Sequence, residues 1–439
     1  MAAPYKGAII SVIFFLSPFL TAIIPRLTWL FLPLTGLALT VPVLRCGRGW
    51  RDLLRPSSAW APLYLLSLYL FLNATWAANQ LFALGSAAIF TGVILIVCAS
   101  TRAVPHIPLT LLRRAALAFA VGAFLGTIYL LLELVTHLSI MRWALNSIDL
   151  LQRNAKHMQI VHGEVTKIKS SVLDRNVAII TFNLWLALLV LTNIDSRHRF
   201  ILAVMGFMLT AAAIFISEHD SSQVALLLSP LIFFSALFWP RLTVQGLATT
   251  WCLAFVLVLP AVLAAYKAEL HEASWLPSSA RHRVIIWEYT AERVPDHLWG
   301  GIGVASTPTL KPKRDIQEKP SGFRFARSTG EHAHDLFLQT WYELGVLGVF
   351  LIAFAGAAVA LAFYSLPIQA IAFVAATFFV CIAIEAFAWS IWQTWLMCAV
   401  GLLAVYVQVA SYASSNIRAT AFVHSDPLAS RPRSCDCDL

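Results

Sequence analysis

The chain has 439 residues, of which 59% are hydrophobic and 12% carry a charge. Because ordinary soluble domains carry roughly 25% charged residues, this composition excludes a soluble globular enzyme. The net charge of +9 is first a signal of topology in a membrane protein, and it does not imply nucleic acid as a partner. One helical crossing of the bilayer needs about 20 mainly apolar residues, so this length accommodates about twelve crossings. We therefore predict an all-α, polytopic membrane protein.

The first apolar segment, residues 8–24, follows Lys6 and runs into Pro25 without a small-residue cleavage site. We expect a retained first span here and not a removed signal peptide. Further apolar windows of suitable length follow, and together they predict about twelve spans. The predicted windows are 8–25, 28–44, 59–77, 81–100, 116–137, 177–194, 200–217, 224–239, 247–265, 344–364, 369–389 and 392–411.

Arginine positions predict the orientation of these spans. If the N-terminus is cytoplasmic, the inside connections are rich in arginine, whereas the short outside turns at 78–80 and 218–223 contain no lysine or arginine. Arg26, in the tight turn after the first span, is the short-turn exception. The positive-inside rule therefore predicts that both ends of the chain are cytoplasmic. The inside arginines are Arg45, Arg48, Arg51, Arg55, Arg102, Arg113, Arg114, Arg197, Arg199 and Arg241.

Cysteine placement agrees with this orientation, because no thiol is predicted on the oxidising side of the membrane. We therefore expect no structural disulfide. The cysteines predicted inside are Cys46, Cys435 and Cys437, and those predicted within spans are Cys98, Cys252, Cys381 and Cys398.

Two long segments, 138–176 and 266–335, are predicted to face the outside. Long translocated segments largely escape the positive-inside rule, so their charges require another explanation. Solvation of a water-facing loop is one interpretation, and binding of an anionic ligand is the other. The first segment carries Arg142, Arg153, Lys156, Lys167, Lys169 and Arg175 against Asp149, Glu164 and Asp174.

A polar stretch precedes the apolar run that begins at Leu344. Ser328 and Glu331 have the spacing of a capping box, which predicts a helix start at this position. His334 would then lie near the helix start, about 15 Å beyond the hydrocarbon edge. The positive end of the helix disfavours imidazolium, so His334 would be neutral and able to accept a proton. A surface histidine in a polar loop is the alternative interpretation.

His332 and His334 form a His-x-His pair, which on a strand would direct both rings at one metal ion. On a helix, residues two apart diverge, and no third ligand is obvious. The Asp-x-Asp sequence at Asp436 and Asp438 lies in the predicted cytoplasmic tail, on the wrong side of the membrane. We therefore expect no metal site and no cofactor.

Two arginines stand out in the outside segments. Arg283 and Trp287 are four residues apart, on one face of a predicted helix. An arginine fork at a membrane surface matches phosphate oxygens, and tryptophan prefers the interface. Arg175 lies directly before a span, where a charge requires a partner. The alternatives are an exposed loop residue for Arg283, and for Arg175 a side chain that reaches water or pairs with Asp174.

These features, in this order, resemble the O-antigen ligase and polymerase superfamily. Its members combine a polytopic chain with a large outside loop before the third-last span, here 266–335. The specific part runs from Arg283 to Gly348: Arg-x-x-x-Trp, then Gly-x-Gly, then His-x-His-Asp-x-x-x-Gln-x-x-x-Glu-x-Gly-x-x-Gly from His332. An arginine before a span that follows an outside segment, here Arg175, is similar to the ligase branch.

The resemblance implies roles for individual residues. In that family the second histidine of the pair is essential and the arginines handle a lipid-linked pyrophosphate, which assigns these roles to His334, Arg283 and Arg175. This chain has Asp335 where relatives often have asparagine after that histidine. The turn 220–223 also lacks the Ser-Arg that many relatives carry there. The first departure affects the expected orientation of His334, and the second affects an expected third arginine contact.

The resemblance also implies a fold and an activity. We expect the glycosyltransferase C-type membrane fold and metal-independent, inverting transfer of a polysaccharide from undecaprenyl pyrophosphate to a lipid A core sugar. This step of lipopolysaccharide assembly would take place at the periplasmic face of a bacterial inner membrane. The expected partners are the lipid-linked donor, the lipid A core acceptor and membrane lipids. The expected organisation is spans 1–9 over 1–265, a periplasmic loop with the catalytic motif over 266–335, spans 10–12 over 336–411 and a cytoplasmic tail over 412–439.

Three other functions stay open on the sequence. An O-antigen polymerase would use a second lipid-linked glycan as acceptor, and a protein O-oligosaccharyltransferase would modify a protein; both share the motif. A non-catalytic membrane transporter should have charged residues deep in its spans, where Glu133 and Glu385 are among few candidates.

Overall fold

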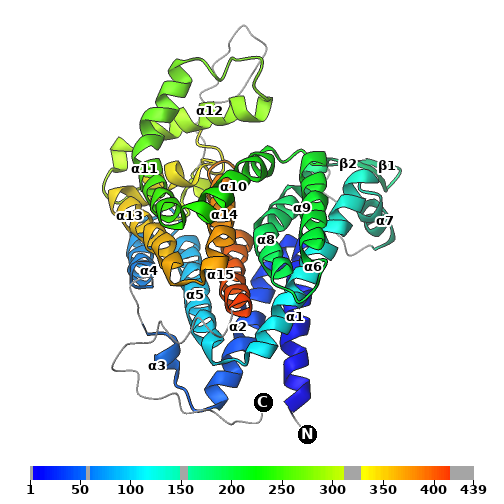
Figure 1. Cartoon of the computed structure of the whole chain (residues 1–439). Helices are drawn as coiled ribbons and strands as arrows, with labels where there is room; N and C mark the ends of the chain where they lie inside the picture. Colours follow the sequence, from blue (N-terminus) through cyan, green and yellow to red (C-terminus); the bar gives the residue numbers. More distant parts are fainter. Residues whose placement is uncertain (1–2, 56–59, 149–156, 311–327, 416–439) are drawn as a thin grey trace.

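The computed structural model of the chain describes residues 3–55, 60–148, 157–310 and 328–415, and these are almost entirely helical (Figure 1). Within these ranges the one sheet is a hairpin of β1 (Met158–Val161) and β2 (Glu164–Ile168). The predicted all-α class is therefore confirmed. The helices are α1 (Ala3–Ile23), α2 (Thr28–Arg45), α3 (Trp50–Leu53), α4 (Ala61–Asn73), α5 (Gln80–Ala103), α6 (Leu109–Val135), α7 (Ser139–Ser147), α8 (Asp174–Thr192), α9 (Arg199–Ile216), α10 (Asp220–Phe238), α11 (Pro240–Lys267), α12 (Ser278–Ala291), α13 (Leu336–Leu361), α14 (Ile368–Glu385) and α15 (Thr394–Ser414).

Ten helices in the described part of the chain are long and apolar enough to cross a membrane. Each of the twelve predicted windows contains a helix, but two of these helices are shorter: the apolar part of α1, Ala8–Ile23, and α4, with 13 residues. At 1.5 Å per residue, α4 is about 20 Å long, less than the thickness of the bilayer core. The chain is a multi-pass membrane protein whose predicted spans include these two short helices.

Small residues allow α1 to pack closely along α6. A Cβ atom at Gly122 would lie 2.1 Å from the backbone oxygen of Phe15, and one at Gly126 would lie 2.6 Å from the Cβ atom of Ala22. Close backbone approach at small residues is typical of membrane bundles, where van der Waals packing drives helix association. Alanine at either position would force the two helices apart.

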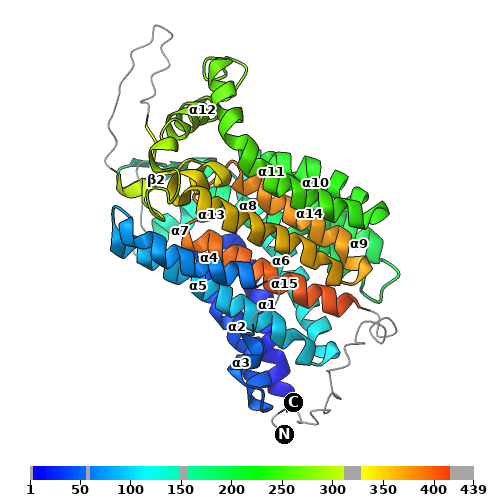
Figure 2. The same ribbon diagram turned by 90° about the vertical axis from the view of Figure 1, so that its left-hand side faces the viewer.

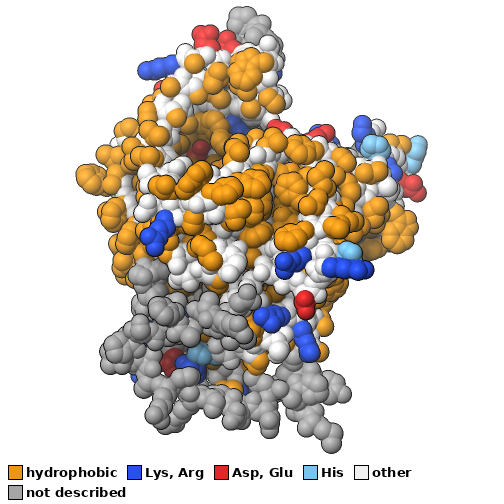
Figure 3. Space-filling model, in the orientation of Figure 1, with side chains coloured by type: hydrophobic (Ala, Val, Ile, Leu, Met, Phe, Trp, Pro, Cys, Tyr) orange, Lys and Arg blue, Asp and Glu red, His pale blue; other side chains and the backbone are white. Residues whose placement is uncertain are grey.

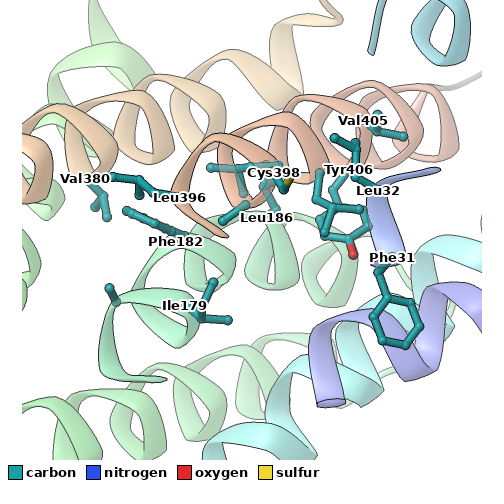
Figure 4. Packing of buried hydrophobic residues seen from close by; sticks show 14 of the residues in the cluster. Phe31, Leu32, Ile179, Phe182, Leu186, Val380, Leu396, Cys398, Val405 and Tyr406 are labelled. Atoms are coloured by element: carbon teal, nitrogen blue, oxygen red, sulfur yellow. The ribbon is translucent and has the colours of Figure 1, made fainter. Parts of the chain in front are cut away.

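Helix α8 occupies the centre of the bundle. Its side chains are buried continuously from Val177 to Val190, so this helix faces protein on all sides. Figure 4 shows Phe182 and Leu186 of α8 beside Leu396 and Cys398 of α15. The core of the protein is therefore built around α8 and α15.

Alternate connections of the bundle gather at one end, which we call the motif end. They are the connections that follow α1, α4, α6, α9, α11 and α14. Hydrogen bonds link several of them: Thr28 donates to the backbone oxygen of Trp395 (2.8 Å), and Asn176 donates to that of Ile23 (2.8 Å). Helix α12 lies at this end, whereas α3 lies at the other (Figures 1 and 2). Successive connections between the spans therefore lie at alternate ends of the bundle, as the arginine positions predict.

A broad hydrophobic surface separates the two ends of the molecule on the face drawn in Figure 3. Exposed apolar side chains of α9 and α10, among them Val204, Met208 and Leu231, have relative exposures of 63%, 61% and 63%. In water such a surface would promote association, but in a bilayer it faces lipid of the same polarity. The surface therefore fits a membrane-embedded bundle.

The outside segment 138–176 contains α7 and the hairpin. Met158 pairs with Ile168 and Val161 with Glu164, and the register shifts after Gln159. The two turn residues at 162–163 both have positive φ, 51° and 84°, as a type I′ turn requires.

Two side chains of α7 hold the hairpin in place. Asn146 accepts a hydrogen bond from the Val165 amide (2.9 Å) and donates one to its carbonyl oxygen (3.2 Å). Arg142 donates to the backbone of β2 at 3.1 Å. Arg142 therefore has a structural contact. Two of the other basic residues predicted for an anionic ligand, Arg153 and Lys156, lie outside the described residues.

Candidate active site

The start of α13 differs from the capping-box prediction. The helix begins at Leu336, and its N-cap is Asp335, whose carboxylate accepts a hydrogen bond from the Leu338 amide at 2.8 Å. The capping box at Ser328 and Glu331 was wrong. Asp335 has an extended backbone and directly precedes the apolar helix. Its side chain can therefore accept a hydrogen bond from an amide of the first helical turn that has no partner within the helix.

His334 directly precedes the N-cap of this helix. His334 lies two residues before the first residue of α13, which is also the first residue of the apolar span Leu336–Ser365. The histidine therefore lies at the N-terminal end of this helix, and its distance of about 15 Å from the hydrocarbon edge stays a prediction.

A backbone hydrogen bond fixes the orientation of the His334 ring. Its Nδ1 atom lies 2.6 Å from the backbone oxygen of Ala388. A carbonyl oxygen only accepts, so Nδ1 carries the hydrogen and, in the neutral ring, Nε2 carries the free lone pair. Burial lowers the pKa of His334; the Ala388 bond raises it, and the positive charge of Arg283 lowers it further. The ring is thus held neutral with one nitrogen able to accept a proton.

The two histidines of the pair lie side by side. Their ring centroids are 3.9 Å apart, because the segment before α13 is not helical and His334 has a positive φ of 53°. Trp287 of α12 donates to the backbone oxygen of Ala333, between them, at 2.9 Å. Burial, followed by the neighbouring His334, lowers the pKa of His332 to about 3. Two members of the sequence motif, the tryptophan and the histidine pair, are therefore in direct contact.

No group of three His, Cys, Asp or Glu side chains within the described ranges is placed to hold a metal ion. Asp436, Asp438, Cys435 and Cys437 lie outside those ranges. Within the described ranges, no disulfide bond joins the five cysteines.

The glycines of the motif form a backbone pairing. Helix α13 breaks at Gly345 (φ 62°, ψ −166°), and the loop around Gly301 runs against the break. Ile302 and Gly303 donate to the carbonyl oxygens of Tyr342 and Glu343, both at 3.0 Å. A Cβ atom at Gly301 would lie 2.2 Å from the backbone carbon of Glu343, so only glycine allows this approach.

Glu343 connects the loop, α13 and the connection before α15. Its carboxylate accepts hydrogen bonds from the amide and hydroxyl of Thr307 (3.0 and 2.6 Å), from Gln339 (3.0 Å) and from the Trp392 indole. Gln339 also donates to Ser390 at 2.9 Å. A buried carboxylate that accepts this many hydrogen bonds fixes its neighbours in one arrangement.

The connection between α14 and α15 is longer than the sequence indicated. The predicted spans 369–389 and 392–411 left almost no turn, but α14 ends at Glu385 and α15 begins at Thr394. Ala388, Ser390 and Trp392 leave the helix because they bind His334, Gln339 and Glu343. We call residues 386–393 the tether segment.

A cavity of about 850 Å³ opens at the motif end. One part of its wall is polar or charged and includes Arg26, Arg175, Glu331 and His332. Another part is apolar and comes from α2 and α5. The apolar residues there are Trp29, Leu81, Phe82 and Ile89, which are 57%, 83%, 50% and 37% exposed. The cavity is therefore lined both by charged side chains and by exposed apolar side chains.

Of the three site residues predicted from the sequence, one lines this cavity and two do not. Arg175, the second residue of α8, lines it, and its guanidinium lies 5.6 Å from the centre of the Trp395 ring. The positive charges of Arg283 and Arg175 act on His332, and the neutral ring of His334 lies beside it. Only His332 and Arg175 of these four lie in its wall.

Arg283 lies on the acidic side of the site. Burial lowers the pKa of Arg283, whereas the charges of Asp220 and Asp174 raise it. The same arginine, after burial, lowers the pKa of His219 to about 4. Arg283 therefore interacts electrostatically with both acidic residues and with His219.

Three residues of the cavity wall were not predicted as site residues from the sequence: Arg26, His332 and Trp395. Arg26 had a signal, since it was the short-turn exception to the charge pattern. His332 was considered as a metal ligand alone. Trp395 gave no signal, because its contact with Arg175 joins positions far apart in the chain.

Fold and site together define a multi-pass membrane protein with a candidate site for an amphiphilic anion at one end of a helix bundle. Residues 205–353 match the family described as O-antigen ligase. This stretch contains Arg283, Trp287, His334 and Glu343, and the match confirms the resemblance over that part of the chain.

Two relatives add a distant similarity. The chain is 25% identical over 200 residues to a "Putative polysaccharide ligase" of Rickettsia felis, covering 43% of this chain and 47% of that protein. It is 24% identical over 183 residues to a similarly named protein of Rickettsia conorii, covering 41% and 43%. In each case the similarity spans less than half of the relative.

Proposed function

We propose that the chain is a glycosyltransferase of the O-antigen ligase type. It transfers a polysaccharide from undecaprenyl pyrophosphate to a sugar of the lipid A core, at the periplasmic face of a bacterial inner membrane. The family match over residues 205–353 and the two polysaccharide ligase relatives support a ligase- or polymerase-type role.

The cavity is the observation that carries the proposal. A lipid-linked pyrophosphate has a charged head and a hydrocarbon tail, and the cavity offers cations on one side and exposed apolar residues of α2 and α5 on the other. Arginine guanidinium groups bind phosphate oxygens well through paired hydrogen bonds. Exposed apolar side chains can contact the hydrocarbon chain of a polyprenyl lipid.

The proposed chemistry is a direct displacement. The acceptor hydroxyl oxygen attacks the anomeric carbon of the donor, the bond between that carbon and the pyrophosphate oxygen breaks, and the hydroxyl proton moves to Nε2 of His334. Arg175 and Arg283 stabilise the negative charge on the departing undecaprenyl pyrophosphate. The donor supplies its own leaving group, so no nucleotide takes part. One displacement inverts the anomeric configuration.

The proposed organisation follows from the site. Residues 266–335 form the periplasmic loop with the catalytic motif, between spans 1–9 in residues 1–265 and spans 10–12 in residues 336–411. The segment 412–439 forms a cytoplasmic tail. The tether segment, between the last two spans, completes the site from the same face.

A transfer assay tests the function. Purified full-length protein in nanodiscs is given an undecaprenyl-pyrophosphate-linked glycan and, separately, lipid A core, a second lipid-linked glycan or a peptide. We expect transfer to lipid A core, unchanged by excess EDTA. Transfer to the glycan alone would establish a polymerase, and transfer to the peptide alone an oligosaccharyltransferase. No transfer, with movement of the lipid across the bilayer, would establish a transporter.

A further inference from the structure

The turn after α1 is fixed in position by two neighbouring helices. This 3₁₀ turn, η1 (Pro25–Leu27), carries Arg26. Asn176 of α8 donates to the last carbonyl groups of α1 at 2.8 Å, and Thr28 donates to the backbone oxygen of Trp395 at 2.8 Å. The turn therefore lies between the starts of α8 and α15, where Arg175 and Trp395 form their contact.

Arg26 is a second cation on the charged side of the cavity. Its side chain is exposed and lines the cavity together with Arg175, and its charge acts on that arginine. Glu331 also lines the cavity, but no carboxylate of the described residues lies within 4.0 Å of the Arg26 guanidinium. The two like charges face one space, and the charge of Asp174 also acts on Arg175.

This arrangement favours an anion between the two guanidinium groups. A ligand with two negative groups would relieve the repulsion between Arg26 and Arg175 and accept hydrogen bonds from both. The position of Arg26 is also unfavourable for topology, because short outside turns ordinarily avoid arginine. An anionic ligand at this position would explain why an arginine occurs in this short outside turn.

We propose that Arg26 binds the pyrophosphate of the lipid-linked donor together with Arg175. The inference rests on the proposed function and adds a contact from the N-terminal part of the chain. This contact is distinct from the Ser-Arg expected at 220–223, which the chain lacks.

Binding of undecaprenyl pyrophosphate to full-length protein in neutral-lipid nanodiscs tests the proposal, with undecaprenyl monophosphate as a second ligand. Arg26→Gln should weaken pyrophosphate binding about tenfold, the loss expected for one charged hydrogen bond. Arg26→Lys should recover part of this loss, and the monophosphate should lose less. Arg241→Gln, an exposed arginine at the other end of the bundle, is the matched control and should bind like the wild type.

The outcomes separate this inference from the proposed function. Unchanged binding by Arg26→Gln, with loss by Arg175→Gln, would overturn the role of Arg26 and leave the function standing. No pyrophosphate binding by the wild type would overturn both. Binding of phosphatidylglycerol, measured as a third ligand, distinguishes bilayer headgroups from the donor. Equal loss of phosphatidylglycerol and pyrophosphate binding by Arg26→Gln would assign Arg26 to bilayer headgroups and also overturn the proposal.

Discussion

The Nδ1 atom of His334 lies 2.6 Å from the backbone oxygen of Ala388, a residue 54 positions further along the chain. A loop residue before α13 is thus oriented by the tether segment between the last two helices. Gln339 and Glu343 bind Ser390 and Trp392 of the same segment. The orientation of the proposed base and the packing of α13 depend on one short connection.

Replacement of His334 should affect the chemical step. Loss of a general base typically lowers a rate by about 10² to 10⁴, so His334→Ala should bind the donor normally and scarcely transfer it. His332→Ala should be milder in transfer and should mainly weaken donor binding, because His332 lines the cavity. Single-turnover transfer and donor binding are measured in parallel. Near-normal transfer by correctly inserted His334→Ala would remove this residue from the mechanism.

The transfer rate should fall in acid, at a pH below the ordinary histidine value. His334 must be neutral to accept a proton, and burial lowers its pKa from 6.5. The neutral form therefore persists at pH 6.5, and the rate should decline only below it. A single-turnover pH profile from about pH 4.5 to about pH 8 measures this limb. A midpoint above 6.5 would contradict a neutral, buried base.

Asp335 provides the control for that profile. Burial raises the pKa of Asp335 to about 7, so its carboxyl would add a limb near neutrality if its charge acted on the neighbouring His334. Asp335→Asn keeps an oxygen for the Leu338 amide but does not titrate. The acid limb should be the same in this variant if His334 is its origin.

Arg283→Lys should impair transfer although the charge is kept. Lysine lacks the planar fork that binds two phosphate oxygens, so the expected loss in kcat/KM is about 10- to 100-fold. Arg241→Lys, at the opposite end of the bundle, should have no effect. Unchanged kcat/KM in Arg283→Lys would mean that Arg283 contributes charge and no specific geometry.

Glu343→Ala should destabilise the protein. The change leaves the Thr307 amide, the Gln339 amide group and the Trp392 indole without their acceptor, with an expected loss of about 2–4 kcal/mol. Thermal unfolding in detergent, followed by intrinsic fluorescence, should give a lower Tm. Glu343→Gln keeps one carbonyl acceptor and should lie between. A wild-type Tm in Glu343→Ala would show that this network contributes little to stability.

Thiol labelling tests which face carries the site. Single cysteines replace Ser274, after α11, and Asp195, after α8, in a chain without its seven native cysteines. Both positions have exposed side chains. An impermeant maleimide added to whole cells should label the first and not the second. The reverse pattern would invert the proposed orientation.

Much of the fold follows from apolar segments and arginine positions, because each span must satisfy its own backbone in lipid. This is why every predicted window contains a helix. The site follows less completely. Arg283 and Trp287 share α12. Of the three predicted site residues, however, only Arg175 lines the cavity. The ends of α13 and α14 were misplaced because contacts such as Asp335 with Leu338 and Ser390 with Gln339, and not apolar length, decide where these helices begin and end.

The tether segment also determines when the site can form during synthesis of the chain. Residues 386–395 carry the partners of His334, Gln339, Glu343 and Arg175, and they are among the last parts of the bundle to be synthesised. A nascent chain grows and inserts from its N-terminus. A chain inserted only as far as α13 would therefore contain His334 without the backbone oxygen of Ala388 that orients its ring. On the proposed function, competence to transfer would arise only once α14 and α15 are in place, so an incompletely inserted chain would not use the lipid-linked donor.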